Sequence, residues 1–292
     1  MSLTVHAPAK INLTLDVTGR RADGYHELTS IFQTVSRCDS VTLTKTADGI
    51  LLETPGGAPC PPEKNTAYRA AQAFFAHTGI AGGVALTLTK RIPQQAGMGG
   101  GSADAAAVLA GLDRLYDTRL PHDTLRALAA TIGADVPFCY AGGCFRARGI
   151  GEKLEKLPPL APCHVLLAIG KESAPTAWAY SLADRLPPQA QPGAEKILSA
   201  LHSGALPKIC DAMYNRFEAA VLPARPQALA LRKALLCGGA DGAMLSGSGA
   251  GVFGIFSPEK ATAAEKTLAQ LRQTGYWAEL CTVGSAERNR TK

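Results

Sequence analysis

Residues 93–106 constrain this chain more than any other segment. Four glycines, at position 97 and at positions 99–101, come just before an alanine-rich stretch whose apolar residues repeat at helical spacing. Because glycine lacks a Cβ, the backbone there can adopt positive φ and turn several N–H groups toward one point. A helix expected to open at Ser102 would add the partial positive charge of its N-terminus. We interpret the segment as a phosphate-binding loop, because clustered glycines cost backbone entropy and serve no evident packing purpose. It is not a Walker A loop, since no Gly-Lys-Ser/Thr follows.

The rest of the chain mixes strand and helix patterns. Apolar residues alternate with polar ones over 11–17, which predicts a half-buried strand with Lys10 and Asn12 on the same face. Asn65 is positioned to cap a helix. A proline-rich stretch at 157–162 is the best candidate linker. We therefore expect an α+β protein of two domains, residues 1–157 and 163–285.

Composition excludes several classes of protein. The chain has 292 residues, 46% of them hydrophobic and 18% charged, which argues against a disordered protein. The net charge is +6, but lysine and arginine are scattered, apart from a basic tail at 288–292 that we interpret as a frayed terminus. None of the eight cysteines has C-x-x-C spacing, so a zinc site is not expected. Without an apolar leader or a run of 18 apolar residues, we expect a cytoplasmic protein with no nucleic-acid or membrane partner.

Three other segments are ambiguous when taken singly. Residues 246–251 form a second glycine cluster, but a strand-like segment follows it, so the dinucleotide fingerprint lacks its helix. A tight hairpin and a ligand loop remain equally open there. Asp135 precedes Val136-Pro137 and alone would be a turn or capping residue. Tyr25 and His26, alone, would be a loop pair.

Together these segments resemble the GHMP kinases. The three motifs of that family correspond to residues 7–13, 93–106 and 245–251, in the same order along the chain. Within the family, the segments PAKINLTLDV, RRADGYHEL, GADVPF and LSGSGAGVFG resemble the 4-diphosphocytidyl-2-C-methyl-D-erythritol kinases particularly closely. The likeness extends over roughly residues 5–256. It departs at Gln95, Ala96 and Met98, where many members carry small residues and leucine.

The resemblance implies a fold and an activity. The fold would be an N-terminal mixed sheet with helices and a C-terminal ferredoxin-like domain, with the active site in the cleft between them. The activity would be ATP-dependent phosphorylation of the 2-hydroxyl of 4-diphosphocytidyl-2-C-methyl-D-erythritol, giving the 2-phosphate and ADP in the non-mevalonate pathway of isoprenoid biosynthesis. ATP would be the co-substrate and Mg²⁺ the metal, and the partner would be a small molecule with a cytidine diphosphate group. Monomer and homodimer both remain open.

The resemblance also assigns roles to residues. Asp135 would be the catalytic base and Lys10 its partner, while Ser102 would be the neighbour of Mg²⁺. The residues expected to bind ATP are Pro93, Gln94, Gln95, Ala96, Gly97, Met98, Gly99, Gly100, Gly101, Ser102, Ala103 and Asn65. The residues expected to bind the second substrate are Asn12, Tyr25, His26, Thr176, Tyr180 and Gly247. Trp178 competes with Tyr180 as a stacking aromatic, and Asn65 is equally well explained as a helix cap.

Other functions predict other features. A GHMP kinase acting on mevalonate derivatives, homoserine or a galactose-like sugar would have no use for the Asp23-Gly24-Tyr25-His26 segment. A non-catalytic nucleotide-binding homologue should have lost Asp135 or Lys10, and both are present. An RNA-binding domain should show a concentrated basic face, which the scattered charges do not supply.

Overall fold

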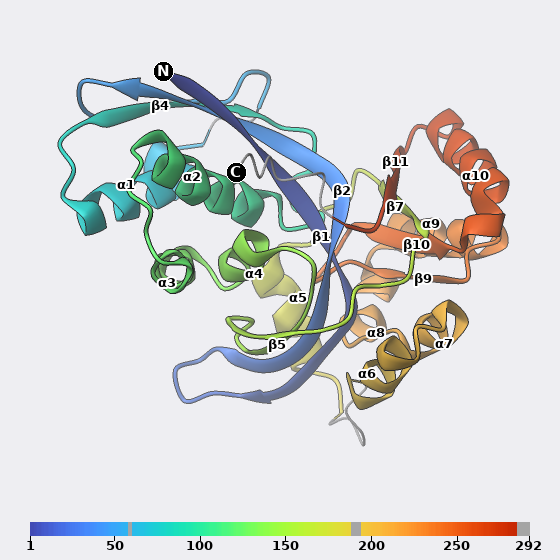
Figure 1. Cartoon of the computed structure of the whole chain (residues 1–292). Coiled ribbons are helices and arrows are strands. Elements are labelled where there is room, and N and C mark those ends of the chain that lie inside the picture. Colours follow the sequence, from blue (N-terminus) through green and yellow to red (C-terminus); the bar gives the residue numbers. More distant parts are fainter. Residues whose placement is uncertain (58–59, 188–193, 285–292) are drawn as a thin grey trace.

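The computed structural model describes residues 1–57, 60–187 and 194–284 and contains two β-sheets with helices packed on each (Figure 1). The basic tail and residue 285, the predicted end of the second domain, lie outside the described residues. Within the described residues, no helix has both the length and the apolar character needed to cross a membrane.

The larger sheet is built on a long antiparallel hairpin that runs through the middle of the molecule (Figure 1). Its order is β3-β4-β2-β1-β8, and β5 pairs with β2 beside β4 and carries β6 on its other side. Two of the pairings, β3 with β4 and β1 with β8, are parallel, so the predicted mixed sheet is confirmed. The strands are β1 (Ser2–Arg20), β2 (His26–Thr46), β3 (Ile50–Glu53), β4 (Gly83–Thr89), β5 (Cys144–Gly149), β6 (Lys153–Lys156) and β8 (Tyr214–Asn215).

Four helices pack beside this sheet and enclose its first core. They are α1 (Thr66–Thr78), α2 (Gly100–Leu115), α3 (His122–Ile132) and α4 (Val136–Ala141). Asn65 caps α1 as predicted, because its Oδ1 accepts the backbone N–H of Ala67 at 2.9 Å. Phe74, Leu43 and Leu112 are fully buried in this core.

The predicted strand at 11–17 exists, but the prediction that it is half-buried is wrong. Every residue from 7 to 16 is buried on both faces of β1. Helix α2 packs near one face, while Ile11 and Leu13 belong to a second core shared with the C-terminal sheet. The polar side chains of β1 are therefore held inside the protein, where they must find hydrogen-bond partners.

The smaller sheet is entirely antiparallel and has the order β11-β7-β10-β9. Helices follow β7 and β10, so the unit is βαββαβ with its first and third strands at the centre, which confirms the predicted ferredoxin-like arrangement. The strands are β7 (His164–Ile169), β9 (Gly242–Leu245), β10 (Val252–Phe256) and β11 (Trp277–Thr282). The helices are α5 (Thr176–Ala183), α6 (Ala194–Ser203), α7 (Leu206–Ala212), α8 (Glu218–Val221), α9 (Pro226–Cys237) and α10 (Ala261–Gln273).

The two halves of the chain share a hydrophobic core. Ile11 of β1 and Met98 of the glycine-rich loop are buried with Val165 and Phe253 of the smaller sheet. Leu157 and Leu160 of the predicted linker are buried in the same cluster. The predicted linker is thus packed into the shared core. The division into domains at 1–157 and 163–285 stays a prediction.

Candidate active site

A cleft of about 1380 Å³ runs between the two halves of the chain. Its walls come from the start of β2, one face of α5, the glycine-rich loop and the first turns of α1 and α2. Lys10 and Asp135 are among the residues that line it. The sequence motifs, which are far apart along the chain, therefore meet around one cavity.

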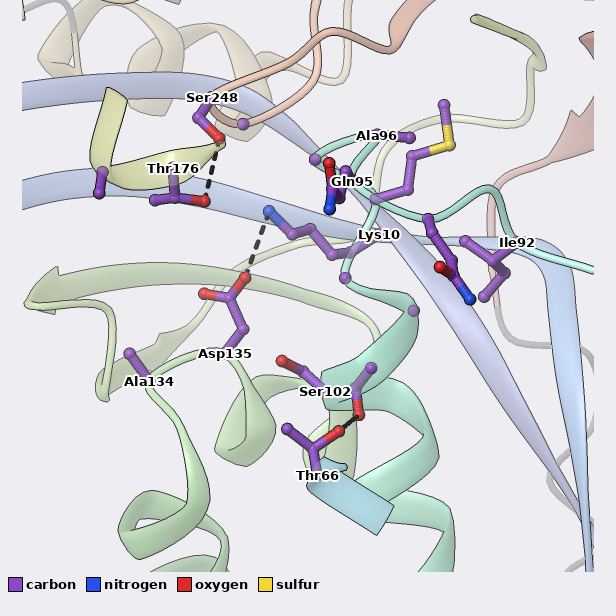
Figure 2. Close-up of a pocket in the computed structure, with 18 of the residues that line it drawn as sticks. Lys10, Thr66, Ile92, Gln95, Ala96, Ser102, Ala134, Asp135, Thr176 and Ser248 are labelled. Atoms are coloured by element: carbon purple, nitrogen blue, oxygen red, sulfur yellow. Dashed lines mark hydrogen bonds and ion pairs between the residues drawn. The ribbon is translucent and has the colours of Figure 1, made fainter. Parts of the chain in front are cut away.

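Lys10 and Asp135 face one another in this cleft (Figure 2). Lys10 Nζ lies 3.4 Å from Asp135 Oδ2, and the Lys10 side chain is 5% exposed against 32% for Asp135. Asp135 occupies the N-cap position of α4, but its side chain makes no capping hydrogen bond. Its carboxylate is therefore available to the cleft, unlike that of a purely structural capping residue.

A chain of hydrogen bonds fixes Lys10 from behind. Lys10 Nζ donates to Asn12 Oδ1 at 2.8 Å, and Asn12 Nδ2 donates to Ser30 Oγ at 2.8 Å. Ser30 Oγ then donates to the Thr14 carbonyl at 2.7 Å. The ammonium also lies 5.0 Å from the centroid of the Phe32 ring, a cation–π distance. The sequence placed Lys10 and Asn12 on one face, and the structure shows why both tolerate burial.

The glycine-rich loop differs from its prediction in two respects. Helix α2 begins at Gly100 and not at Ser102, because Gly99 adopts φ 72° as its N-cap and the next two glycines form the first turn. The expectation that the glycines serve no packing purpose is also wrong. A Cβ on Gly97 would overlap the Ser246 carbonyl, and one on Gly99 would lie 2.9 Å from the Lys10 side chain. These positions require glycine for close approach as well as for backbone conformation.

The second glycine cluster is a hairpin loop that packs on the first. It joins β9 to β10, and Ser246 Oγ donates to the Gly97 carbonyl at 3.0 Å. Asn215, a buried residue that the sequence did not single out, donates through Nδ2 to the carbonyls of Leu245 and Gly247. The alternatives of hairpin and ligand loop are therefore not exclusive, because Gly247 also lines the cleft.

A buried charge cluster joins the two ends of the glycine-rich loop. Lys90, just before the loop, forms ion pairs with Asp39 of β2 and with Asp104 of α2. Asp39 also accepts the backbone N–H of Ile92 at 2.8 Å. Burial raises the pKa of Asp104 to about 7, although the Lys90 ammonium opposes this shift. The cluster was not predicted, because a lysine and two aspartates at these spacings carry no local signal.

Helices α1 and α2 meet beside the cleft, where α2 begins. Thr66 Oγ1 donates to the Gly101 carbonyl at 2.6 Å, and Ser102 lies near it in the first turn of α2 (Figure 2). Asn65 lines the cleft and caps α1 through its Oδ1, so its amide nitrogen is the part left for a ligand.

Aromatic side chains form the opposite end of the cleft. Tyr25 is 61% exposed, whereas His26 stacks on Tyr180 with ring centroids 4.4 Å apart and planes 15° apart. Burial raises the pKa of the Tyr180 hydroxyl to about 12, so it is neutral at ordinary pH. Trp178 does not line this cleft. Its ring instead packs against Arg225, whose guanidinium carbon lies 3.8 Å from the ring centroid. The geometry therefore favours Tyr180 over Trp178 as the second aromatic.

The structure brings together nearly every residue that the sequence singled out. Of the predicted site residues, Ala103 alone does not line the cleft, because its side chain is buried against the core between α2 and the sheet. Thr176 lines it and has its Oγ1 3.3 Å from Ser248 Oγ (Figure 2). Asp184, which bonds to His26, was missed, since the two residues are on separate halves of the chain. Within the described ranges, no group of three or more His, Cys, Asp or Glu side chains is placed to hold a metal ion.

Comparison with known proteins gives the same picture. The model of the GHMP kinases N terminal domain matches residues 65–143, and that of the GHMP kinases C terminal matches residues 197–276. A protein of Gloeobacter violaceus named 4-diphosphocytidyl-2-C-methyl-D-erythritol kinase is 42% identical over 87% of this chain and 85% of its own length. Its namesake from Moorella thermoacetica is also 42% identical, over 87% and 90%.

Solved structures agree at the level of the fold. A crystal structure of 4-(cytidine 5'-diphospho)-2C-methyl-D-erythritol kinase superposes with a TM-score of 0.79 at 36% identity, covering 97% of this chain and 99% of the other. A homoserine kinase from Cytophaga hutchinsonii gives a TM-score of 0.77 at 22% identity over 97% and 95%, which supports the fold alone. With both halves matched and relatives this similar over most of their length, the chain belongs to the GHMP kinase family.

Proposed function

We propose that this chain is an ATP-dependent 4-diphosphocytidyl-2-C-methyl-D-erythritol kinase, which phosphorylates the 2-hydroxyl of that substrate and releases ADP. Relatives carrying this name are 37–42% identical over most of the chain. The observation that carries the chemistry is the Lys10–Asp135 pair, which lies in the cleft between the glycine-rich loop and the His26–Tyr180 stack.

Asp135 acts as the general base. The substrate hydroxyl must lose its proton as its oxygen attacks the γ-phosphorus, and a positioned carboxylate can accept that proton. Asp135 suits this role because its side chain is one-third exposed to the cleft and is not used to cap α4.

Lys10 orients the Asp135 carboxylate and stabilises negative charge on the transferred phosphoryl group. Its buried ammonium is fixed by Asn12, so little reorganisation is needed during the reaction. The backbone N–H of Lys10 also donates to the Met98 carbonyl at 3.0 Å, which ties the ammonium's strand to the glycine-rich loop.

The glycine-rich loop and the N-terminus of α2 hold the phosphates of ATP. Backbone N–H groups in the first turn of a helix have no intrahelical partners, and they attract anionic oxygens. Mg²⁺, when bound, would neutralise phosphate charge. The described residues fit an ion held mainly by phosphates and water, since they form no three-residue ligand cluster, and Ser102 is the neighbour we assign to it.

The aromatic end of the cleft receives the cytidine. Tyr25 is exposed and free to stack on a base, and Tyr180 and His26 form an ordered wall beside it. Asn12, Thr176 and Gly247 also line the cleft and are assigned to the rest of the substrate.

The test is a phosphotransfer assay with ATP against a panel of alcohols, read by ³¹P NMR. The panel contains the cytidyl substrate, methylerythritol 4-phosphate, mevalonate, homoserine and galactose. We expect one new phosphomonoester signal, with the cytidyl substrate alone. If methylerythritol 4-phosphate were turned over as fast as the cytidyl substrate, the proposed substrate would be wrong. Phosphorylation of mevalonate or homoserine would assign the chain to another branch of the family.

A further inference from the structure

His26 and Asp184 join the two halves of the chain across the aromatic end of the cleft. His26 Nε2 lies 2.6 Å from Asp184 Oδ1. The His26 side chain is 13% exposed and that of Asp184 is 40% exposed. His26 begins β2, whereas Asp184 directly follows α5, so the pair connects the long hairpin to a helix of the C-terminal half. Both residues line the cleft.

The end of α5 holds the His26 ring in two ways at once. Asp184 follows Tyr180 by one helical turn, and its N–H donates to the Tyr180 carbonyl at 2.9 Å. Residues four apart lie on the same face of a helix, so the stacking ring and the accepting carboxylate approach His26 together. Tyr180 is itself fixed by an edge contact with buried Phe217, at a centroid distance of 4.9 Å.

The hydrogen bond to Asp184 determines what the other ring nitrogen can do. A carboxylate accepts hydrogen bonds, so Nε2 must carry the hydrogen. In the neutral imidazole the remaining nitrogen, Nδ1, is then an acceptor. Among the hydrogen bonds formed by the described residues, none involves His26 Nδ1.

We propose that Asp184 is a positioning residue for base specificity: by holding His26 as the Nε2–H tautomer against Tyr180, it makes the cleft prefer a base with an exocyclic amino group. Cytosine offers an N–H donor at its 4-position, whereas uracil has a carbonyl oxygen there, which an Nδ1 acceptor would repel. This inference rests on the proposed function, because it refines the choice of nucleotide at the same site.

A plain surface ion pair is the competing explanation of the His26–Asp184 contact. Such a pair contributes little to stability and should have no effect on the choice of base. A double-mutant cycle separates the two explanations, because a residue that acts through His26 has no effect once His26 is gone.

The experiment measures the dissociation constants of CDP and UDP by calorimetry, with the nucleotide end of the cleft saturated by ADP. The proteins are wild type, Asp184→Ala, His26→Ala and the double variant. Ser181→Ala is the matched control, since Ser181 lies on α5 and lines the cleft but donates to the Trp178 carbonyl. Asp184→Glu keeps the carboxylate and tests rescue.

We expect Asp184→Ala to reduce the preference for CDP over UDP by about three- to tenfold, the size of one hydrogen bond. The same substitution should have no effect in the His26→Ala background, Asp184→Glu should recover part of the preference, and Ser181→Ala should keep all of it. Equal weakening of CDP and UDP, or the same loss in both backgrounds, would overturn the inference. A wild-type protein without preference for CDP would overturn it too, even if phosphotransfer to the cytidyl substrate were observed, so its failure is distinct from that of the proposed function.

Discussion

Lys10 Nζ lies 3.4 Å from Asp135 Oδ2, although Lys10 belongs to the first strand and Asp135 precedes the fourth helix. The lysine reaches the cleft from the buried stretch of β1, residues 7–16, while the aspartate stands where a short helix begins. Because the lysine is buried and fixed by Asn12, its charge has a defined place from which to act on the carboxylate.

Asp135→Asn should lower kcat by roughly 100-fold or more, the range expected for losing a general base, and should leave ATP affinity nearly unchanged. Lys10→Met should also lower kcat, and the double variant should fall far short of the summed effects because the two groups act as a unit. Steady-state kinetics with ATP titrations measure this. Asp123→Asn, which alters an exposed carboxylate on α3, is the control. Near-normal turnover in Asp135→Asn would remove this residue from the mechanism.

Gly97→Ala should weaken ATP binding and lower the melting temperature, because Gly97 has φ 70° and its new methyl group would overlap the Ser246 carbonyl. Gly79→Ala is the matched control: Gly79 has φ 63° but its Cβ would meet open space. That control should show only the backbone strain, about 1–2 kcal/mol, with ATP affinity retained. Calorimetric titration with ATP and thermal denaturation distinguish the two variants. Equal behaviour of both would mean that the contact between the two glycine segments does not matter.

Tyr25→Ala should reduce kcat/KM for the cytidyl substrate by about 5- to 150-fold, corresponding to the 1–3 kcal/mol of a base–aromatic stack. Its melting temperature and KM for ATP should scarcely change, since the ring is 61% exposed. Tyr68→Ala on α1, whose ring does not line the cleft, is the control. A variant with wild-type kcat/KM would show that Tyr25 does not stack on the base.

Asn65 can be tested for two roles with two substitutions. Asn65→Asp keeps an N-cap acceptor but loses the amide donor, so stability should be retained while ATP affinity falls. Asn65→Ala loses both, and should also destabilise the fold by about 1 kcal/mol. Chemical denaturation and ATP titration measure the two effects. If Asn65→Asp binds ATP normally, the residue is a helix cap and nothing more.

Asp104 should make stability decline as pH rises. Its carboxyl ionises near 3.8 when unfolded, whereas burial raises its pKa to about 7 in the fold. Between these values the folded state holds a proton that the unfolded state has lost, so the contribution of Asp104 to stability is fully present below about pH 4 and is lost as the pH rises to about 7. Asp104→Asn cannot ionise, and its melting temperature should therefore fall less between pH 5 and pH 8 than that of wild type. Parallel melting curves for the two proteins would contradict a raised pKa.

Local patterns were sufficient to predict much of this fold. The alternation of apolar and polar residues located β1, and Asn65 marked the start of α1. Both glycine-rich segments line the cleft. The burial of both faces of β1 could not be predicted, because the alternation of apolar and polar residues distinguishes the two faces of a strand but does not show what packs on each face. The start of α2 was misjudged because glycine is a poor helix former, yet here it enters the first turn, where the backbone approaches Lys10 and Ile92 closely.

Pairings between distant segments could not be predicted from single residues. The resemblance to the GHMP kinases indicated that Lys10 and Asp135 share a site, but nothing in the sequence linked His26 to Asp184 or Lys90 to Asp39. Such pairs depend on how strands and helices are stacked, and their residue types are common on any surface. Asn215 was missed for the same reason: a lone asparagine gives no sign that it will bind the carbonyls of a loop.

The core shared by the two halves limits where this enzyme can move. Ala96 and Met98 of the phosphate loop are buried against the C-terminal sheet, so shifting that loop would unpack the centre of the molecule. Residues 18–25, at the tip of the long hairpin, are exposed and carry no such restraint. Under the proposed function, the loop assigned to ATP is therefore held by core packing, and adjustment on ligand entry is expected at the exposed hairpin tip that carries Tyr25.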